Sequence, residues 1–350
     1  MGKFIKSLLG VLVLGAVAAA LLYFFDLTQP SEVMEVLEEE EGAGQESEPQ
    51  AFSIETLIDA QYPGSDLFLE QTLSDGPNYT RSVVSYASEG LKIYALLTVP
   101  KVDKPAGGFP AIVMNHGSVP PDEYSTPERY KGYVAYFARR GYVVLKPDYR
   151  GHGHSEGVPL SSYYDPGYVT DVLNAVSSLQ RHPDVNAEKI GMWGHSSGGH
   201  ITTVAMIVNP KIKAGVIWAG LTASYDETFV EWRAHRRRLG SSSSSTASPY
   251  RRQSQVLEEK YGSISQATEF WRGVTPFNYF SRILHPLQLH HGTADNIVPL
   301  KYAEYFLGKL LAAGRVAELF TYPGADHNLS GSAFAPAMAR SVEFFDQHLK

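Results

Sequence analysis

The chain contains no cysteine among its 350 residues. That absence excludes disulfide bonds, zinc–thiolate sites, iron–sulfur clusters, a thiol nucleophile and a lipidated cysteine. One stretch has no basic residue: residues 31–50 include eight glutamates and no lysine or arginine. The net charge of the whole chain is −7, so without these eight negative charges the rest of the chain is close to neutral. We therefore expect no nucleic-acid partner.

The acidic stretch is also poor in apolar residues, so it cannot bury enough surface to fold alone. We interpret residues 28–50 as a solvated tether. Specific cation binding would need carboxylates held by a scaffold, and the composition of this segment offers none.

A long apolar run precedes the tether. Leu8–Phe25 is a run of 18 uncharged residues, with Lys3 and Lys6 before it and Asp26 after it. A helix of this length spans about 27 Å, close to the roughly 30 Å of a hydrocarbon core. Residues 1–27 are therefore predicted to form a cytoplasmic stub and a transmembrane signal-anchor, which places the rest of the chain outside the cytoplasm.

The alternative for this segment is a cleavable signal peptide and a secreted protein. Ala16-Val17-Ala18 has the small residues that a cleavage site requires. The apolar run continues from there to Phe25, beyond the usual end of a cleavable signal, which favours the uncleaved anchor.

From about Arg81 onward, apolar runs of strand length alternate with helical periodicity. Two segments flanking Glu89-Gly90, Ser82–Ser88 and Leu91–Val99, predict a hairpin. The strands predicted after it are Phe109–Asn115, Tyr142–Pro147, Ile190–Trp193, Ala214–Ala219, Leu287–His291 and Ala317–Tyr322. The predicted helices are Tyr133–Arg140, Val169–Gln180, Ser197–Val208, Leu300–Ala313 and Pro336–Leu349.

This alternation predicts an α/β domain over residues 51–350, with a mostly parallel sheet and helices on both faces. An eight-stranded α/β barrel shows the same alternation. The opening hairpin is antiparallel and favours an open sheet instead.

The interval between Ala219 and Leu287 is too long for a single crossover helix. It contains an arginine cluster around Arg236 and the serine run Ser241–Ser245. We predict a small helical cap inserted at about residues 222–284. The arginine cluster either forms a solvated helix face or binds acidic partners or lipid head groups.

The segment Gly194-His195-Ser196-Ser197-Gly198 lies between a predicted strand and a predicted helix. A serine at such a sharp turn exposes its Oγ, and glycines two residues away on either side let neighbouring elements approach closely. Ser196 is therefore the predicted nucleophile. The turn also places the N–H of Ser197 at a helix N-terminus, where an oxyanion is stabilised.

A serine nucleophile needs an imidazole to take its proton and a carboxylate to orient that imidazole. Asp295 and His327 each follow a predicted strand, at the edge where open α/β sheets place their sites. Asp326 is the alternative acid, but its side chain, adjacent in sequence to the histidine, should point elsewhere. The predicted triad is Ser196, Asp295 and His327, in the chain order of the α/β-hydrolase fold.

The second oxyanion donor is expected just after the strand Phe109–Asn115. The N–H of Ser118 is the main candidate, with Gly117 and the Tyr124 hydroxyl as alternatives. A metal site is a further interpretation of the histidines at 152, 154, 290 and 291. No carboxylate motif accompanies them, so we predict no metal and no cofactor.

Together these motifs resemble the α/β-hydrolase superfamily, and within it the catalytic domain of the prolyl oligopeptidase family of serine peptidases. The resemblance covers roughly residues 81–350. It is carried by Asn115-His116-Gly117, Asp148-Tyr149-Arg150-Gly151, Ile190–His200, Thr275–Tyr279, His291–Asp295 and Gly324–His327.

This resemblance implies a serine hydrolase that forms an acyl-enzyme and cleaves a small peptide. Two features depart from the family: no β-propeller precedes the domain, and Ser118 stands where many members have a second glycine. A carboxylesterase or dienelactone-hydrolase-like esterase is the alternative. A membrane-tethered binding module without activity is the third interpretation, although all three members of the triad are present.

Overall fold

The computed structural model describes residues 52–159, 161–222, 225, 228–238, 249–266 and 268–350. The predicted membrane helix and acidic tether lie outside these ranges. Within them, no helix has both the length and the apolar character needed to cross a bilayer.

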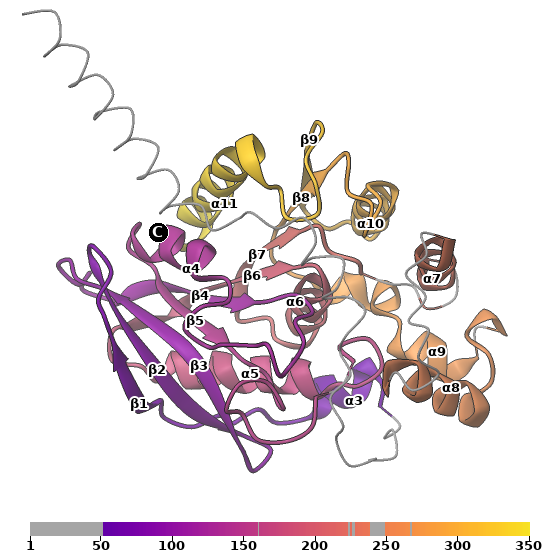
Figure 1. The fold of residues 1–350 in the computed structure, drawn as a ribbon, viewed down its shortest axis with the longest axis horizontal. Helices are drawn as coiled ribbons and strands as arrows, with labels where there is room; N and C mark the ends of the chain where they lie inside the picture. The colour runs from indigo at the N-terminus through magenta and orange to yellow at the C-terminus, as the bar shows by residue number, and fades with distance from the viewer. Residues whose placement is uncertain (1–51, 160, 223–224, 226–227, 239–248, 267) are drawn as a thin grey trace, which may run out of the picture. The chain divides into compact units, whose positions relative to one another are not determined.

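The described residues form a nine-stranded sheet in the order β1-β2-β3-β5-β4-β6-β7-β8-β9 (Figure 1). The strands are β1 (Phe68–Leu73), β2 (Tyr79–Ser88), β3 (Leu91–Pro100), β4 (Phe109–Asn115), β5 (Val143–Pro147), β6 (Val185–His195), β7 (Ile212–Trp218), β8 (Leu287–Gly292) and β9 (Ala317–Tyr322). The helices are α3 (Ile54–Asp59), α4 (Lys131–Ala138), α5 (Gly167–Gln180), α6 (Ser197–Val208), α7 (Thr228–Arg238), α8 (Pro249–Tyr261), α9 (Glu269–Val274), α10 (Lys301–Ala312) and α11 (Phe334–Leu349).

The sheet is antiparallel at its beginning and parallel after that. Strands β1, β2, β3 and β5 pair antiparallel, whereas β5, β4, β6, β7, β8 and β9 pair parallel. Strands β1 and β9 are its edges, so the sheet is open and the barrel alternative is wrong. The predicted α/β fold with a mostly parallel sheet is confirmed.

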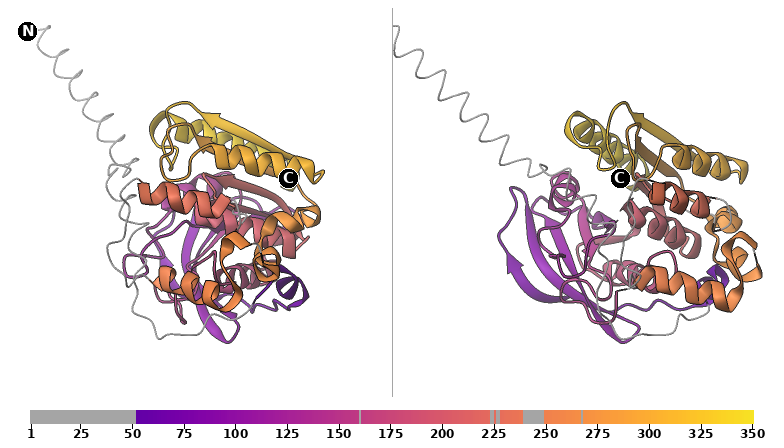
Figure 2. Two further views of the ribbon diagram at one scale, coloured as in Figure 1. Left: turned by 90° about the vertical axis from the view of Figure 1, so that its right-hand side faces the viewer. Right: turned by 45° about the vertical axis from the view of Figure 1, so that its right-hand side comes forward.

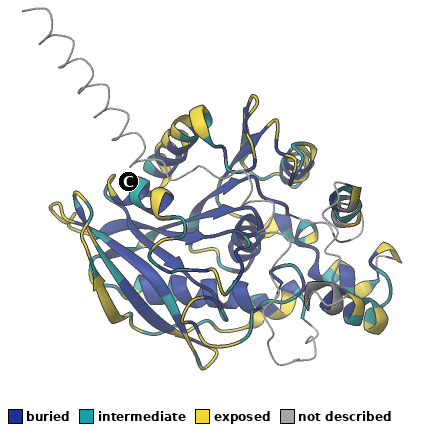
Figure 3. Ribbon diagram, in the orientation of Figure 1, coloured by how far each residue is buried: buried dark blue, intermediate teal, exposed yellow. Residues whose placement is uncertain are grey.

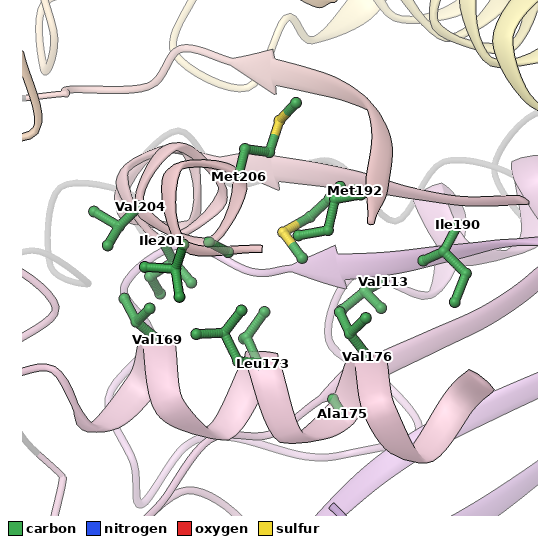
Figure 4. Packing of buried hydrophobic residues seen from close by; sticks show 14 of the residues in the cluster. Val113, Val169, Leu173, Ala175, Val176, Ile190, Met192, Ile201, Val204 and Met206 are labelled. Atoms are coloured by element: carbon green, nitrogen blue, oxygen red, sulfur yellow. The ribbon is translucent and has the colours of Figure 1, made fainter. Parts of the chain in front are cut away.

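Alternate residues of the central strands supply two hydrophobic cores, one on each face of the sheet. On β4, Ala111 and Val113 pack with α5, α6 and α10, whereas Ile112 and Met114 pack with α4 and α11. Figure 4 shows the first of these cores, in which side chains of α5 meet those of α6 and the sheet. Figure 3 shows the central strands buried and much of β1 exposed. Because helices pack against both faces, the sheet that supports the site is held between two layers of helices.

The carboxyl ends of the parallel strands meet at one edge of the sheet. Asn115 at the end of β4 pairs with Gly194 of β6, and His195 pairs with Trp218 of β7. Helices α10 and α11 flank the β8–β9 end of the sheet (Figure 2). The loops that leave these adjacent strands are therefore close together in space.

The interval between β7 and β8 contains α7, α8 and α9 among its described residues. Helix α7 contacts the loop after β8, because Trp232 Nε1 donates to the Ile297 carbonyl at 2.9 Å and His235 Nε2 lies 3.2 Å from the Asn296 carbonyl. Arg233, from the predicted arginine cluster, pairs with Glu258 of α8 at 3.4 Å. The described residues of this interval are thus largely helical, and the cap at residues 222–284 stays a prediction.

Candidate active site

Ser196 sits on a strained turn between β6 and α6. Its backbone has φ 53° and ψ −122°, a region that few residues other than glycine adopt. The turn is held because the Ser196 N–H donates to the Trp218 carbonyl at 2.9 Å, and the Gly199 N–H donates to the Ser196 carbonyl at 2.9 Å. A non-glycine residue kept in this conformation is a common mark of a functional site.

The glycines two residues before and after Ser196 have no room for a side chain. A methyl group on Gly194 would lie 2.3 Å from the Gly198 carbonyl oxygen. A methyl group on Gly198 would lie 2.3 Å from the Asn115 carbonyl oxygen and 2.6 Å from that of His116. Gly194 therefore lets α6 pack directly against the end of β6, and Gly198 lets it pack against the end of β4.

Asp295 lies in the loop after β8, and its carboxylate accepts several hydrogen bonds. The Oδ1 atom accepts the N–H groups of Ile297 and Val298, each at 2.9 Å. The Oδ2 atom accepts His327 Nδ1 at 2.8 Å and lies 3.2 Å from His291 Nε2. These contacts fix the orientation of the carboxylate and direct one oxygen at His327.

The electrostatics keep Asp295 ionised. Burial alone would raise the pKa of this carboxyl group, but the charge of His327 and the hydrogen bonds from His291 and His327 outweigh it. The net result is an Asp295 pKa well below its ordinary value. A buried, ionised carboxylate on Nδ1 leaves His327 Nε2 free to accept a proton.

His195 connects the serine turn to the histidine loop. Its Nε2 atom donates to the backbone carbonyl of His327 at 3.1 Å, and the two imidazole rings lie 4.9 Å apart. The residue immediately before Ser196 therefore holds the backbone of His327. The structure thus brings the Ser196 turn, Asp295 and His327 to the same edge of the sheet.

The two predicted oxyanion donors are neighbours. The Ser118 and Ser197 hydroxyls lie 3.2 Å apart, so the loop after β4 meets the start of α6. The alternatives are already bonded: the Gly117 N–H donates to the Tyr130 hydroxyl at 2.9 Å, and the Tyr124 hydroxyl donates to Asp148 Oδ1 at 2.9 Å.

Asp326 does not contact the imidazole of His327. Its Oδ1 atom accepts the N–H of Asn328 at 3.1 Å and that of Ser330 at 2.8 Å. An exposed carboxylate that caps its own loop leaves Asp295 as the partner of His327.

The four histidines considered for a metal site lie in different surroundings, and the ring of His154 lies 5.8 Å from that of Tyr94. His152 lies edge-on to a ring stack that includes His116. His290 bonds Gln288 and Tyr322 within the sheet, and His291 contacts Asp295. In the part of the chain that the structure describes, no three His, Asp or Glu side chains form a group suited to a metal ion.

A buried polar cluster beneath the loop after β4 was not predicted from the sequence. Lys146 donates to the Tyr124 hydroxyl, and Thr126 donates to Asp148. Burial raises the pKa of Asp148 to about 6 and lowers that of Lys146 to about 8. The cluster fixes Tyr124 and Thr126 and thus the loop that contains Ser118. No spacing in the sequence indicates it, because the residues come from separate segments.

An open α/β sheet with a serine on a strand-to-helix turn, followed along the chain by an acid loop and a histidine loop, defines the α/β-hydrolase class. The comparison with family models agrees and is more specific. The model of the prolyl oligopeptidase family matches residues 129–350, and the chain belongs to this family of serine hydrolases.

Known proteins similar to this chain include both peptidases and esterases. The uncharacterized peptidase YtmA of Bacillus subtilis is 26% identical over 251 residues, which is 70% of this chain and 84% of that protein. The acylaminoacyl peptidase of Pyrococcus horikoshii has a TM-score of 0.59 and 22% identity, covering 78% of this chain but only 42% of the peptidase. Acetyl xylan esterase 1 of Thermoanaerobacterium has a TM-score of 0.60 and 15% identity, covering 91% of this chain and 98% of the esterase.

Proposed function

We propose that Ser196 is the nucleophile of this serine hydrolase, with His327 as general base and Asp295 as the acid that orients it. The observation that carries the proposal is the 2.8 Å hydrogen bond from His327 Nδ1 to the buried Asp295 carboxylate, beside the strained Ser196 turn. In the first step, Ser196 Oγ attacks the substrate carbonyl and His327 Nε2 takes its proton. His327 then protonates the leaving group, and water releases the acyl group by the reverse sequence.

The negative oxygen of the tetrahedral intermediate needs two donors. The N–H of Ser197 lies at the start of α6, and the N–H of Ser118 lies on the adjoining loop. The short distance between their hydroxyls supports this pairing. Because Gly117 and Tyr124 already bond other groups, Ser118 is the donor we assign.

We propose a small peptide as the substrate. The family and the similarity to YtmA support this choice. The alternative is an acyl ester, supported by the match to acetyl xylan esterase 1, which extends over nearly the whole of that chain. An ester leaving group needs less protonation, so a peptidase with this site should also cleave activated esters.

We also propose that residues 8–25 anchor the protein in a membrane with the catalytic domain outside the cytoplasm. The apolar run and its flanking lysines support this location. The activity should then remain in the membrane fraction after an alkaline wash, and the mature chain should retain residues 1–18. An N-terminus after Ala18 would contradict the anchor.

The decisive experiment compares kcat/KM of the full chain on peptidyl anilides and on short-chain aryl esters. Ser196→Ala should lower both by a factor on the order of 10⁶, while the exposed Ser265→Ala serves as the matched control. Serine-dependent anilide cleavage supports a peptidase. Ester turnover without anilide cleavage would indicate a carboxylesterase instead of a peptidase. Full activity in Ser196→Ala would overturn the assignment of Ser196 as the nucleophile.

A further inference from the structure

A chain of hydrogen bonds joins three loops of the site through Tyr130, a residue that lies outside the proposed triad. The Gly117 N–H donates to the Tyr130 hydroxyl oxygen at 2.9 Å. That hydroxyl lies 2.7 Å from His195 Nδ1, and His195 Nε2 lies 3.1 Å from the carbonyl oxygen of His327. The chain therefore runs from the loop after β4, through the residue before Ser196, to the histidine loop.

The hydrogens in this chain have a single consistent arrangement. Burial lowers the pKa of His195 to about 3, so its imidazole is neutral and carries one N–H. The His327 carbonyl can only accept, so that N–H is on Nε2. His195 Nδ1 then accepts the Tyr130 O–H, and the Tyr130 oxygen accepts the Gly117 N–H.

The backbone of Tyr130, whose hydroxyl lies between Gly117 and His195, is strained. It has φ 60° and ψ 15°, the left-handed conformation, at the N-cap of α4, where its side chain makes no capping bond. A non-glycine residue adopts this conformation only at a cost in free energy, because its Cβ lies too close to the following carbonyl oxygen. Strain of this kind persists where the surrounding structure requires it, and here it accompanies a bridging contact.

The atoms around Gly117 leave no room for a side chain at this position. A methyl group on Gly117 would lie 2.9 Å from the Tyr130 hydroxyl, 3.1 Å from Ser196 Cβ and 3.3 Å from His195 Nδ1. The loop that contains Ser118 is therefore packed directly against the serine, with the Tyr130 hydroxyl between that loop and His195.

We propose that Tyr130 and His195 are positioning residues, which hold the Ser118 loop and the His327 loop in register around Ser196. This proposal rests on the proposed function of the triad. The bridge fixes the oxyanion donor and the general base relative to each other, although neither Tyr130 nor His195 touches the reacting atoms. It also keeps the Gly117 N–H out of the oxyanion site.

The bridge should affect the chemical step more than substrate binding. Displacement of catalytic groups by about 1 Å costs on the order of 10²-fold in rate. We therefore expect Tyr130→Phe to lower kcat by 10- to 100-fold while KM changes by less than threefold. Tyr142→Phe is the matched control, because it removes a tyrosine hydroxyl that bonds Asp346, far from the site.

His195 allows a rescue test. The amide of glutamine can accept from Tyr130 and donate to the His327 carbonyl, whereas leucine can do neither. We expect His195→Gln to keep most of the wild-type kcat and His195→Leu to lose as much as Tyr130→Phe. The double variant Tyr130→Phe/His195→Leu should lose no more than either single variant, because all three break the same bridge.

Several outcomes would overturn the proposal. These are a kcat for Tyr130→Phe within threefold of wild type, additive losses in the double variant, or equal losses in His195→Gln and His195→Leu. If Tyr130→Phe fails to fold, the two His195 variants decide the question. Inactive wild-type protein, or full activity in Ser196→Ala, would instead count against the proposed function itself.

Discussion

The two halves of the candidate site are held in place by different means. Ser196 is positioned by its backbone, through a strained turn and glycines whose neighbours leave no room for a side chain. His327 is positioned by two hydrogen bonds: its ring Nδ1 donates to Asp295, and its backbone carbonyl accepts from His195 Nε2. The comparison implies that substitutions of the glycines that hold the serine turn will affect folding first, whereas substitutions of the groups that hold His327 will affect catalysis first.

In this comparison, the largest expected effect comes from a substitution in the histidine half. Asp295→Asn keeps an oxygen that can accept the N–H groups of Ile297 and Val298. The amide removes the charge that stabilises the imidazolium and favours the wrong tautomer of His327. We expect kcat/KM to fall on the order of 10⁴-fold.

The control for this prediction is Asp346→Asn, which changes a carboxylate that accepts the Tyr142 hydroxyl away from the site. Both variants should be assayed on the same aryl ester together with thermal unfolding. A loss of less than tenfold for Asp295→Asn would mean that Asp295 does not orient the general base.

The second prediction breaks the serine half. A methyl group on Gly198 would lie 2.3 Å from the Asn115 carbonyl oxygen, and backbone atoms cannot move away cheaply. We expect Gly198→Ala to lower the free energy of unfolding by about 3 kcal/mol, measured by urea denaturation. Activity should fall because the turn and the Ser118 loop move apart.

Gly308→Ala is the matched control for this substitution. Gly308 lies on an exposed face of α10, and apart from its chain neighbours and the backbone of its own helix no atom is within 4 Å of its added methyl group. Alanine there should raise stability by about 0.5–1 kcal/mol. Equal urea midpoints for Gly198→Ala and Gly308→Ala would show that close packing does not fix the serine turn.

The same contrast explains which parts of the site were predictable from the sequence. The serine turn is a local motif, since Gly194, Ser196 and Gly198 lie within five residues and need only a strand before them and a helix after them. Tyr130 was not predicted, because its hydroxyl joins Gly117, His195 and His327 only through the tertiary fold.

The fold shows a similar division between local and non-local information. Strand β4 and helix α6 lie where their apolar patterns predicted them. Strand β6 begins at Val185, five residues before the predicted Ile190, because Val185 pairs with Phe109 of β4. Strand β1 was missed, since almost all of its residues are exposed and show no alternation. The start of β6 and the whole of β1 are therefore determined by pairing with a neighbouring strand rather than by local composition.

The smallest expected effect distinguishes the two halves by their response to acid. Burial lowers the pKa of His195 and His200, both next to the serine turn, to about 3. The ordinary histidine pKa is about 6.5, so between pH 6.5 and 3 the unfolded chain takes up protons that the folded chain does not. Each such histidine lowers the free energy of unfolding by about 1.4 kcal/mol per pH unit as the pH falls through this window.

Asp295 acts in a different window. Its folded pKa lies below its unfolded value near 3.9, so the stability it contributes is present above that pH and is lost only below it. We therefore expect His200→Phe to reduce the slope of unfolding free energy against pH by about 1.4 kcal/mol per unit between pH 5.5 and 4.5. Asp295→Asn should leave that slope unchanged. An unchanged slope in His200→Phe, measured by urea unfolding at several pH values, would mean that this histidine is protonated in the folded protein, and the acid sensitivity of the serine half would then have to come from another group.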